Sequence, residues 1–123
     1  MISKQSPNIK KAQKESQYLR EFANLFLQIS MDDPKVRPLS VTRVKLSPDN
    51  GMCTIFFYAP EGEEQFRTIL GYLILYKASL RKGLAQSIQA RYTPDLVFKY
   101  DSQFEKQKKI DDLIDKLKDE GQL

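Results

Sequence analysis

The chain has 123 residues, of which 41% are hydrophobic and 29% are charged, and its formal net charge at pH 7 is +4. This length suits a single domain with one hydrophobic core, and this composition is that of a globular protein. The sequence contains no histidine and only one cysteine, Cys53, which excludes a histidine-cysteine zinc site, an intrachain disulfide and a histidine general base. We therefore expect no enzyme activity, no metal and no cofactor.

The positive charge is concentrated in two segments. Residues 1–30 contain five Lys or Arg against two acids, and residues 71–100 contain five against one, whereas the remaining stretches are slightly acidic. Such an asymmetry is expected of a protein that binds a polyanion, because lysine and arginine release counterions from phosphate backbones. Ordinary solvated helix faces produce the same pattern, and composition alone does not separate RNA from an acidic protein partner.

The longest apolar runs are far too short to span a membrane, and the first residues show no apolar stretch of signal-peptide length. One unpaired cysteine agrees with a reducing compartment. We expect a cytoplasmic protein without a membrane partner.

Apolar residues predict an amphipathic first helix from about Asn8 to Ile29, ended by the Asp32-Asp33-Pro34-Lys35 segment. Two strands follow at Leu39–Ser47 and Met52–Ala59, and the Pro48-Asp49-Asn50-Gly51 turn between them indicates an antiparallel hairpin. Thr42, Val44 and Leu46 alternate with Val41, Arg43 and Lys45, so one face of the first strand is expected to be buried and the other to carry the two cations.

A long helical stretch begins at Glu63-Glu64, whose charges suit a helix N-terminus. Lys77 falls within its apolar stripe, which predicts a bend at Tyr76-Lys77-Ala78 that exposes Lys77 and Arg81 close to the third strand. The alternative is one straight helix whose Lys77 reaches its edge.

The segment from Pro94 to Tyr100 alternates as a half-buried strand, Asp101 is expected to start or cap the next helix, and a final amphipathic helix covers about Ser102 to Leu117. The order is α-β-β-α-kink-α-β-α. It predicts an α+β fold with a three-stranded sheet packed on helices, as in type II KH domains, although the chain contains no G-x-x-G loop. We expect residues 1–123 to form one KH-like domain with its core at about 8–118 and short flexible termini.

Several motifs in this order resemble the bacterial ribosome-binding factor A family. They are Asp33-Pro34-Lys35, the Val41–Asp49 strand and turn, Leu80-Arg81 after the kink, and the Arg91-Tyr92-Thr93-Pro94-Asp95-Leu96-Val97-Phe98-Lys99-Tyr100-Asp101 run. The resemblance extends over most of the chain, and the last run is its most specific part. Where the family has an Ala-x-Gly kink, this sequence has the bulkier and more basic Tyr76-Lys77-Ala78.

The resemblance implies a KH-like assembly factor that binds the immature 30S ribosomal subunit near the 5′-terminal helix of 16S rRNA. It further implies a role in late maturation and rRNA processing, and in growth in the cold. We expect a monomer without a small-molecule substrate.

The candidate RNA-binding residues are cations on both basic segments and on two strands. Phosphate contacts are expected from Lys77, Arg81, Lys82 and Arg91, with Arg43, Lys45 and Lys99 as supporting charges and Lys10, Lys11 and Lys14 as a second patch. Exposed Tyr92 is a candidate for stacking on a base, with packing against the strand end as the alternative.

Three rival hypotheses remain open at this point. The same fold could bind other structured RNA, or its basic helices could bind an acidic protein. An enzyme is the weakest rival, because Asp111, Asp112 and Asp115 are interspersed with lysines, as on a solvated helix face.

Overall fold

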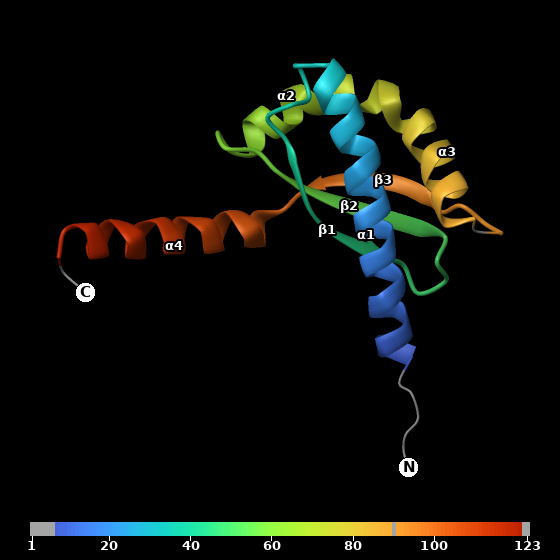
Figure 1. The fold of residues 1–123 in the computed structure, drawn as a ribbon, viewed down its shortest axis with the longest axis horizontal. Helices are drawn as coiled ribbons and strands as arrows, with labels where there is room; N and C mark the ends of the chain where they lie inside the picture. The colour runs from blue at the N-terminus through green and yellow to red at the C-terminus, as the bar shows by residue number, and fades with distance from the viewer. Residues whose placement is uncertain (1–6, 90, 122–123) are drawn as a thin grey trace, which may run out of the picture.

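The computed structural model describes residues 7–89 and 91–121. Its elements appear in the predicted order (Figure 1): α1 (Pro7–Asp32), β1 (Ser40–Leu46), β2 (Met52–Tyr58), α2 (Glu63–Leu73), the 3-10 turn η1 (Ile74–Tyr76), α3 (Lys77–Ile88), β3 (Asp95–Tyr100) and α4 (Ser102–Asp119). The predicted flexible termini fall partly on residues 1–6 and 122–123, which lie outside the described residues.

The three strands form one sheet in the order β1-β2-β3. β1 and β2 are an antiparallel hairpin, as predicted from the turn, and β3 runs parallel to β2 after the crossover through α2 and α3. The register shifts between Val41 and Arg43, so Thr42 occupies a β-bulge. The expectation that Thr42 lies on the buried face, opposite Arg43, is therefore wrong, because both side chains donate hydrogen bonds to Asp101.

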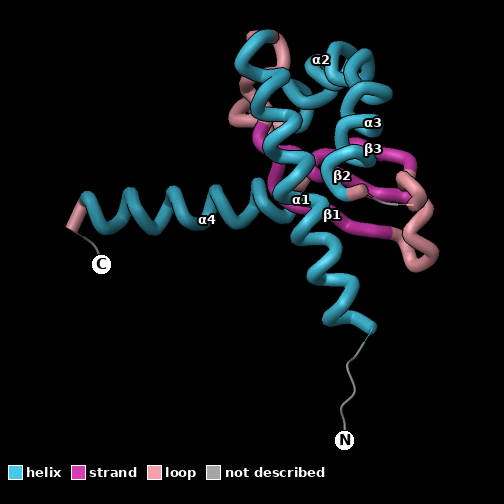
Figure 2. The backbone as a smooth tube through the Cα atoms, turned by 45° about the vertical axis from the view of Figure 1, so that its right-hand side comes forward, coloured by secondary structure: helices cyan, strands magenta, loops and turns pink. Residues whose placement is uncertain are grey.

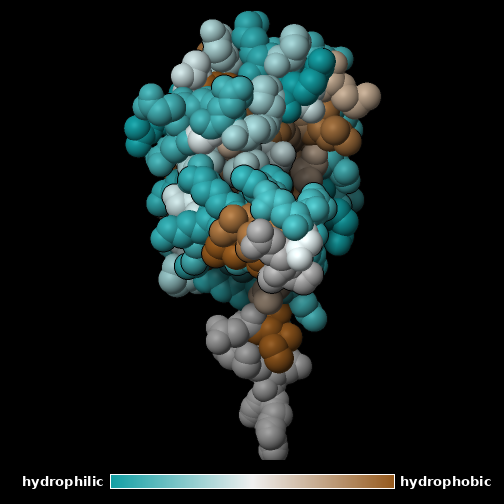
Figure 3. Space-filling view, turned by 90° about the vertical axis from the view of Figure 1, so that its left-hand side faces the viewer, coloured by the Kyte–Doolittle hydropathy of each residue, from teal (hydrophilic) through white to brown (hydrophobic). Residues whose placement is uncertain are grey.

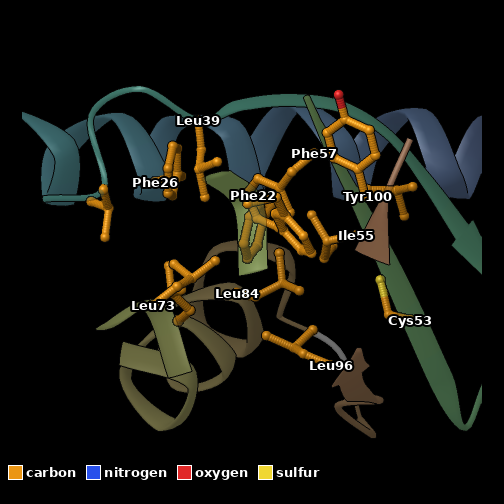
Figure 4. Close-up of a cluster of buried hydrophobic side chains, with 14 of the residues drawn as sticks. Phe22, Phe26, Leu39, Cys53, Ile55, Phe57, Leu73, Leu84, Leu96 and Tyr100 are labelled. Atoms are coloured by element: carbon orange, nitrogen blue, oxygen red, sulfur yellow. The ribbon is translucent and has the colours of Figure 1, made fainter. Parts of the chain in front are cut away.

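The inner face of the sheet is covered by α1, α2 and α3, and the core lies between these layers (Figures 1 and 4). Phe22 of α1 contacts the rings of Phe57 and Phe98, and Phe66 of α2 also contacts Phe57. Cross-strand rows of apolar side chains complete this face, and the fully buried members include Leu46, Cys53, Ile55 and Leu96.

The long helical stretch is broken, as the position of Lys77 predicted. α2 ends at Leu73, and η1 joins it to α3, which takes a different direction (Figure 1). The break begins slightly before the predicted Tyr76-Lys77-Ala78 bend, and the Tyr76 hydroxyl donates a 2.6 Å hydrogen bond to Asp33 Oδ2 at the end of α1. The kink is therefore held against α1 by a specific contact.

The final helix α4 projects from the body of the molecule (Figures 1 and 2). Asp101 caps it as predicted, since its Oδ1 accepts a 3.0 Å hydrogen bond from the Phe104 N–H. None of the α4 residues is buried. From the side on which α4 projects, an apolar patch interrupts the hydrophilic surface (Figure 3), and the exposed apolar residues of α4 are Phe104, Ile110, Leu113 and Ile114.

Candidate nucleic-acid interface

Three adjoining hollows connect the two basic segments of the sequence. The first lies between α1, the β1–β2 turn and the loop before β3. It shares Arg91 and Tyr92 with a second hollow against α3, and Lys14 with a third beside the start of α1. We call this surface the basic groove and define it by its cations, which are Lys10, Lys11, Lys14, Lys82 and Arg91. The packing of α1 beside α3 thus joins charges that lie about 70 residues apart in the sequence.

The cations of the basic groove are available for a ligand. Lys10, Lys14, Lys82 and Arg91 are exposed and Lys11 is half-buried. Within residues 7–89 and 91–121, none of the five takes part in an ion pair. A phosphate can therefore approach them without breaking an internal contact.

Arg81 has a different role from the one predicted. Its guanidinium donates hydrogen bonds of 3.1 Å to the Pro94 carbonyl and 2.8 Å to the Thr93 carbonyl. It also lies 3.4 Å from Asp95 Oδ1. Arg81 thereby fixes the loop before β3 to α3 and positions Arg91 and Tyr92 on that loop. The exposed remainder of its side chain still borders the second hollow.

The kink residues are more enclosed than the sequence suggested. Lys77 is half-buried, with its Nζ 5.9 Å from the centroid of the Phe98 ring, and Tyr76 is bonded to Asp33. Ala78 is exposed and lines the second hollow. Of the three predicted kink residues, Ala78 therefore offers the most open surface.

The strand cations lie on the other face of the sheet, away from the basic groove. Arg43, Phe56 and Lys99 are paired across the three strands. This row alternates with the core-facing row of Val44, Ile55 and Phe98, of which Val44 and Ile55 are buried and Phe98 is half-buried. The Arg43 guanidinium stacks over Phe56 at 4.0 Å and pairs with Asp101 at 3.0 Å. Lys45 and Lys99 are exposed on this face. The two predicted patches are therefore divided differently in the structure. The α1 lysines join Lys82 and Arg91 in the basic groove, whereas the strand cations Arg43, Lys45 and Lys99 form a separate surface.

Three polar residues of the first hollow were not predicted as site residues. Tyr18, Gln17 and Asn50 line it together with Lys14 and Arg91. Tyr18 could have been found from its spacing of four residues to Phe22, which places it on the buried face of α1. Gln17 and Asn50 carry no comparable signal, because their positions in the hollow depend on how α1 meets the β1–β2 turn.

Three titratable groups at or near this surface have shifted pKa values. Burial raises the pKa of Tyr18, which lines the first hollow. Hydrogen bonds from the Ser47 hydroxyl and the Gly51 N–H lower the pKa of Asp49, so this carboxylate of the first hollow is charged at neutral pH. Burial raises the pKa of Cys53 to about 12, so its thiol stays protonated and is a poor nucleophile.

Neither a metal centre nor a membrane span is found in the part of the chain that the structure describes. No three histidine, cysteine or acidic side chains of residues 7–89 and 91–121 are grouped so that they could hold a metal ion. None of the helices described has both the length and the apolar character needed to cross a bilayer.

The sheet order, the broken helix pair and the basic groove place this protein in the class of KH-like α+β domains. Residues 10–114 match the profile of the family described as Ribosome-binding factor A, and the chain belongs to this family.

Proteins of known sequence and structure agree with this assignment. A ribosome-binding factor A from Syntrophus aciditrophicus (strain SB) is 40% identical over 101 residues, covering 79% of this chain and 78% of that protein. The crystal structure of ribosome-binding factor A from Thermus thermophilus superimposes with a TM-score of 0.61 at 30% identity, covering 72% of this chain and 92% of that one. A homology model of the Thermus thermophilus factor, fitted into a cryo-EM map of a 30S–RbfA complex, gives a TM-score of 0.50 at 26% identity, with coverages of 72% and 87%.

Proposed function

We propose that this protein binds the 30S ribosomal subunit and assists its late maturation, with the basic groove contacting the phosphates of 16S rRNA. The observation that carries the proposal is its membership of the ribosome-binding factor A family, one member of which has been fitted into a map of a 30S complex. Five cations without an internal ion partner among the described residues supply the electrostatic attraction. Phosphate contacts carry little sequence information, so selectivity comes from the shape of the folded rRNA.

The proposal extends to the place and the stage of binding. The protein acts near the 5′-terminal helix of 16S rRNA on free or immature subunits and supports rRNA processing and growth in the cold. It works in the cytoplasm as a monomer, in one domain, without a cofactor, a small-molecule substrate or a catalytic step. Loss of the gene is then expected to cause precursor 16S rRNA to accumulate, most of all at low temperature.

Co-sedimentation with purified 30S subunits at low and high salt tests the proposal. The protein is expected to travel with the subunits at low salt and to be released as salt rises, because counterion release drives phosphate binding. If it stays at the top of the gradient at low salt, the proposal is wrong. Equal affinity for unrelated structured RNA would favour a general RNA-binding module, and a partner retained after nuclease treatment would favour an acidic protein.

A further inference from the structure

The largest hollow of the basic groove has a separate chemical character. It is a cleft of about 630 Å³ between α1, the β1–β2 turn and the loop before β3, and we call it the Tyr18 cleft. Ile88, at the end of α3, lines it, whereas the kink lies at the other end of that helix. Ile88 lies eleven positions after Lys77 in the same helix, or roughly 16 Å away at 1.5 Å per residue. The Tyr18 cleft is therefore distinct from the helix junction at the kink.

The cleft is lined by a buried tyrosine, Tyr18, whose hydroxyl has no hydrogen-bond partner among the described residues. Tyr18 is only 5% exposed, and its hydroxyl makes no hydrogen bond to the described residues. Among those residues no fully buried side-chain oxygen or nitrogen lacks a partner, so the Tyr18 hydroxyl must keep contact with solvent. The Tyr18 cleft is the solvent space that this residue lines. A phenol held almost entirely within the core thus presents one free donor and acceptor to a ligand.

Two neutral amides stand beside this hydroxyl. Gln17 and Asn50 line the same cleft, and neither side chain makes a hydrogen bond within residues 7–89 and 91–121. The backbone of Asn50 is fixed in the left-handed conformation at φ 59°, and its N–H donates to the Ser47 carbonyl. Neutral groups that both donate and accept are suited to the edge of a nucleobase, which presents donors and acceptors side by side.

The remaining walls separate an apolar interior from a charged rim. Ile88 and Pro94 offer apolar surface, and Tyr92 is 80% exposed at the border between this cleft and the hollow against α3. Lys14 and Arg91 supply the positive charge. Asp49 is exposed on the β1–β2 turn, is charged and already accepts hydrogen bonds from Ser47 and Gly51, so it disfavours a phosphate beside that turn. A nucleotide therefore fits with its base inside and its phosphate outside.

We propose that the Tyr18 cleft binds one unpaired base of an RNA strand, with Tyr92 stacking on that base or its neighbour and Lys14 and Arg91 holding the flanking phosphates. This inference rests on the proposed RNA binding. It adds a preference for single-stranded RNA over an abasic strand and over paired RNA. It predicts contacts to a base, which a surface of cations alone does not make. A protein surface that contacts only phosphates binds an abasic strand as tightly as an ordinary one.

Fluorescence anisotropy with three labelled RNA probes tests the preference. The probes are a mixed-sequence single-stranded decanucleotide, an abasic ribose-phosphate strand of the same length, and the same decanucleotide paired with its complement. The single strand is expected to bind about tenfold more tightly than either of the others, because stacking and base-edge contacts need an exposed base. Equal binding of the three probes, or tighter binding of the abasic or paired probe, overturns the inference.

Two substitutions with a matched control locate the base. Tyr18→Phe removes only an unpartnered hydroxyl and is expected to weaken single-strand binding about three- to tenfold, the effect of one lost hydrogen bond. Tyr92→Ala is expected to weaken it about tenfold through lost stacking. Tyr72→Phe and Tyr72→Ala are the controls, because Tyr72 is an exposed tyrosine of α2 outside the basic groove. They are expected to leave binding within about twofold of the unaltered protein.

The result separates this inference from the proposed function. Thermal unfolding first establishes that each variant keeps its fold. If Tyr18→Phe and Tyr92→Ala bind the single strand like the unaltered protein, the base does not enter the Tyr18 cleft. Co-sedimentation with 30S subunits then shows independently whether ribosome binding holds, since that association depends on the cations and not on a base in this cleft.

Discussion

At the scale of single residues, Asp101 has more partners than its predicted role as a helix cap requires. Its Oδ2 accepts hydrogen bonds of 2.7 Å from the Thr42 hydroxyl and 3.0 Å from Arg43 Nε, while its Oδ1 caps α4. The residue is only 2% exposed. Its backbone N–H also donates to the Phe57 carbonyl. Asp101 therefore ties the β1 bulge and α4 together through its carboxylate, and joins them to β2 through its backbone N–H.

Replacement of Asp101 by alanine should reduce the free energy of unfolding by about 2–4 kcal/mol, from the loss of a helix cap and of two further hydrogen bonds. Urea unfolding followed by circular dichroism measures this change. Asp119→Ala at the exposed end of α4 is a matched control and is expected to cost less than about 0.5 kcal/mol. A loss at Asp101 as small as that of the control would contradict the role given to this side chain.

Asp101 also makes stability depend on pH in acid. Burial by itself would raise the pKa of Asp101, but hydrogen bonds from Thr42, Phe104 and Arg43 outweigh it and leave this pKa below its ordinary value. The unfolded chain therefore takes up the proton first as the pH falls, so the stabilisation is present above about pH 4 and is lost below it.

Unfolding free energies measured between about pH 6 and pH 2 test this dependence. The unaltered protein should lose stability steadily below about pH 4, and Asp101→Asn should lose less over the same range. A smaller residual dependence is expected in the variant, since the pKa values of Asp33 and Asp49 are also lowered. If the two proteins lose stability identically as the pH falls, Asp101 does not contribute to the pH dependence of the unfolding free energy.

At the scale of elements, the two helix glycines occupy different surroundings. A Cβ added at Gly71 in α2 would meet no atom within 4 Å, whereas one at Gly83 in α3 would lie 3.0 Å from Leu25 Cδ2 of α1. Gly83 therefore allows α3 to approach α1 closely, and this approach joins the two halves of the basic groove. Gly71 has no such role.

Gly71→Ala should raise the free energy of unfolding by about 0.5–1 kcal/mol, because alanine loses less backbone entropy in a helix. Gly83→Ala gains the same helix propensity but presses on Leu25, so it should be neutral or destabilising. Urea unfolding of the two single variants compares them directly. An equal gain at both sites would show that α1 and α3 do not depend on a small residue at their contact.

The sequence predicted the elements better than it predicted their side-chain contacts. Local periodicity and turn residues suffice for the hairpin, the broken helix and the Asp101 cap, all of which are confirmed. The bulge at Thr42 was not predicted, because it depends on pairing with β2 and on a contact with Asp101, which lies 59 residues away. The contact of Glu15 with the sheet was not predicted for the same reason. Its carboxylate accepts a 2.7 Å hydrogen bond from the Leu46 N–H at the edge of the sheet.

At the scale of the whole molecule, the sheet divides the predicted cations between two faces. The basic groove lies on the side of α1 and α3, and Lys45 and Lys99 lie on the outer face of the sheet. From the sequence, Lys45 and Lys99 were expected to support Lys82 and Arg91, with the lysines of α1 as a second patch. The structure groups these cations differently, because which charges share a face depends on how the helices are laid across the strands. Charge reversal on each face in turn can tell which of them binds the ribosomal subunit.

Lys14→Glu combined with Lys82→Glu should weaken binding to 30S subunits by about tenfold or more at low salt, because two phosphate contacts become repulsive. These positions are preferred to Lys77 and Arg81, whose side chains contact Phe98 and the loop before β3. Lys45→Glu with Lys99→Glu makes the same change in net charge on the outer face and should alter binding less than about threefold. The reverse ranking in co-sedimentation would assign the RNA to the outer face, and equal losses would mean that net charge, without a defined groove, governs the association.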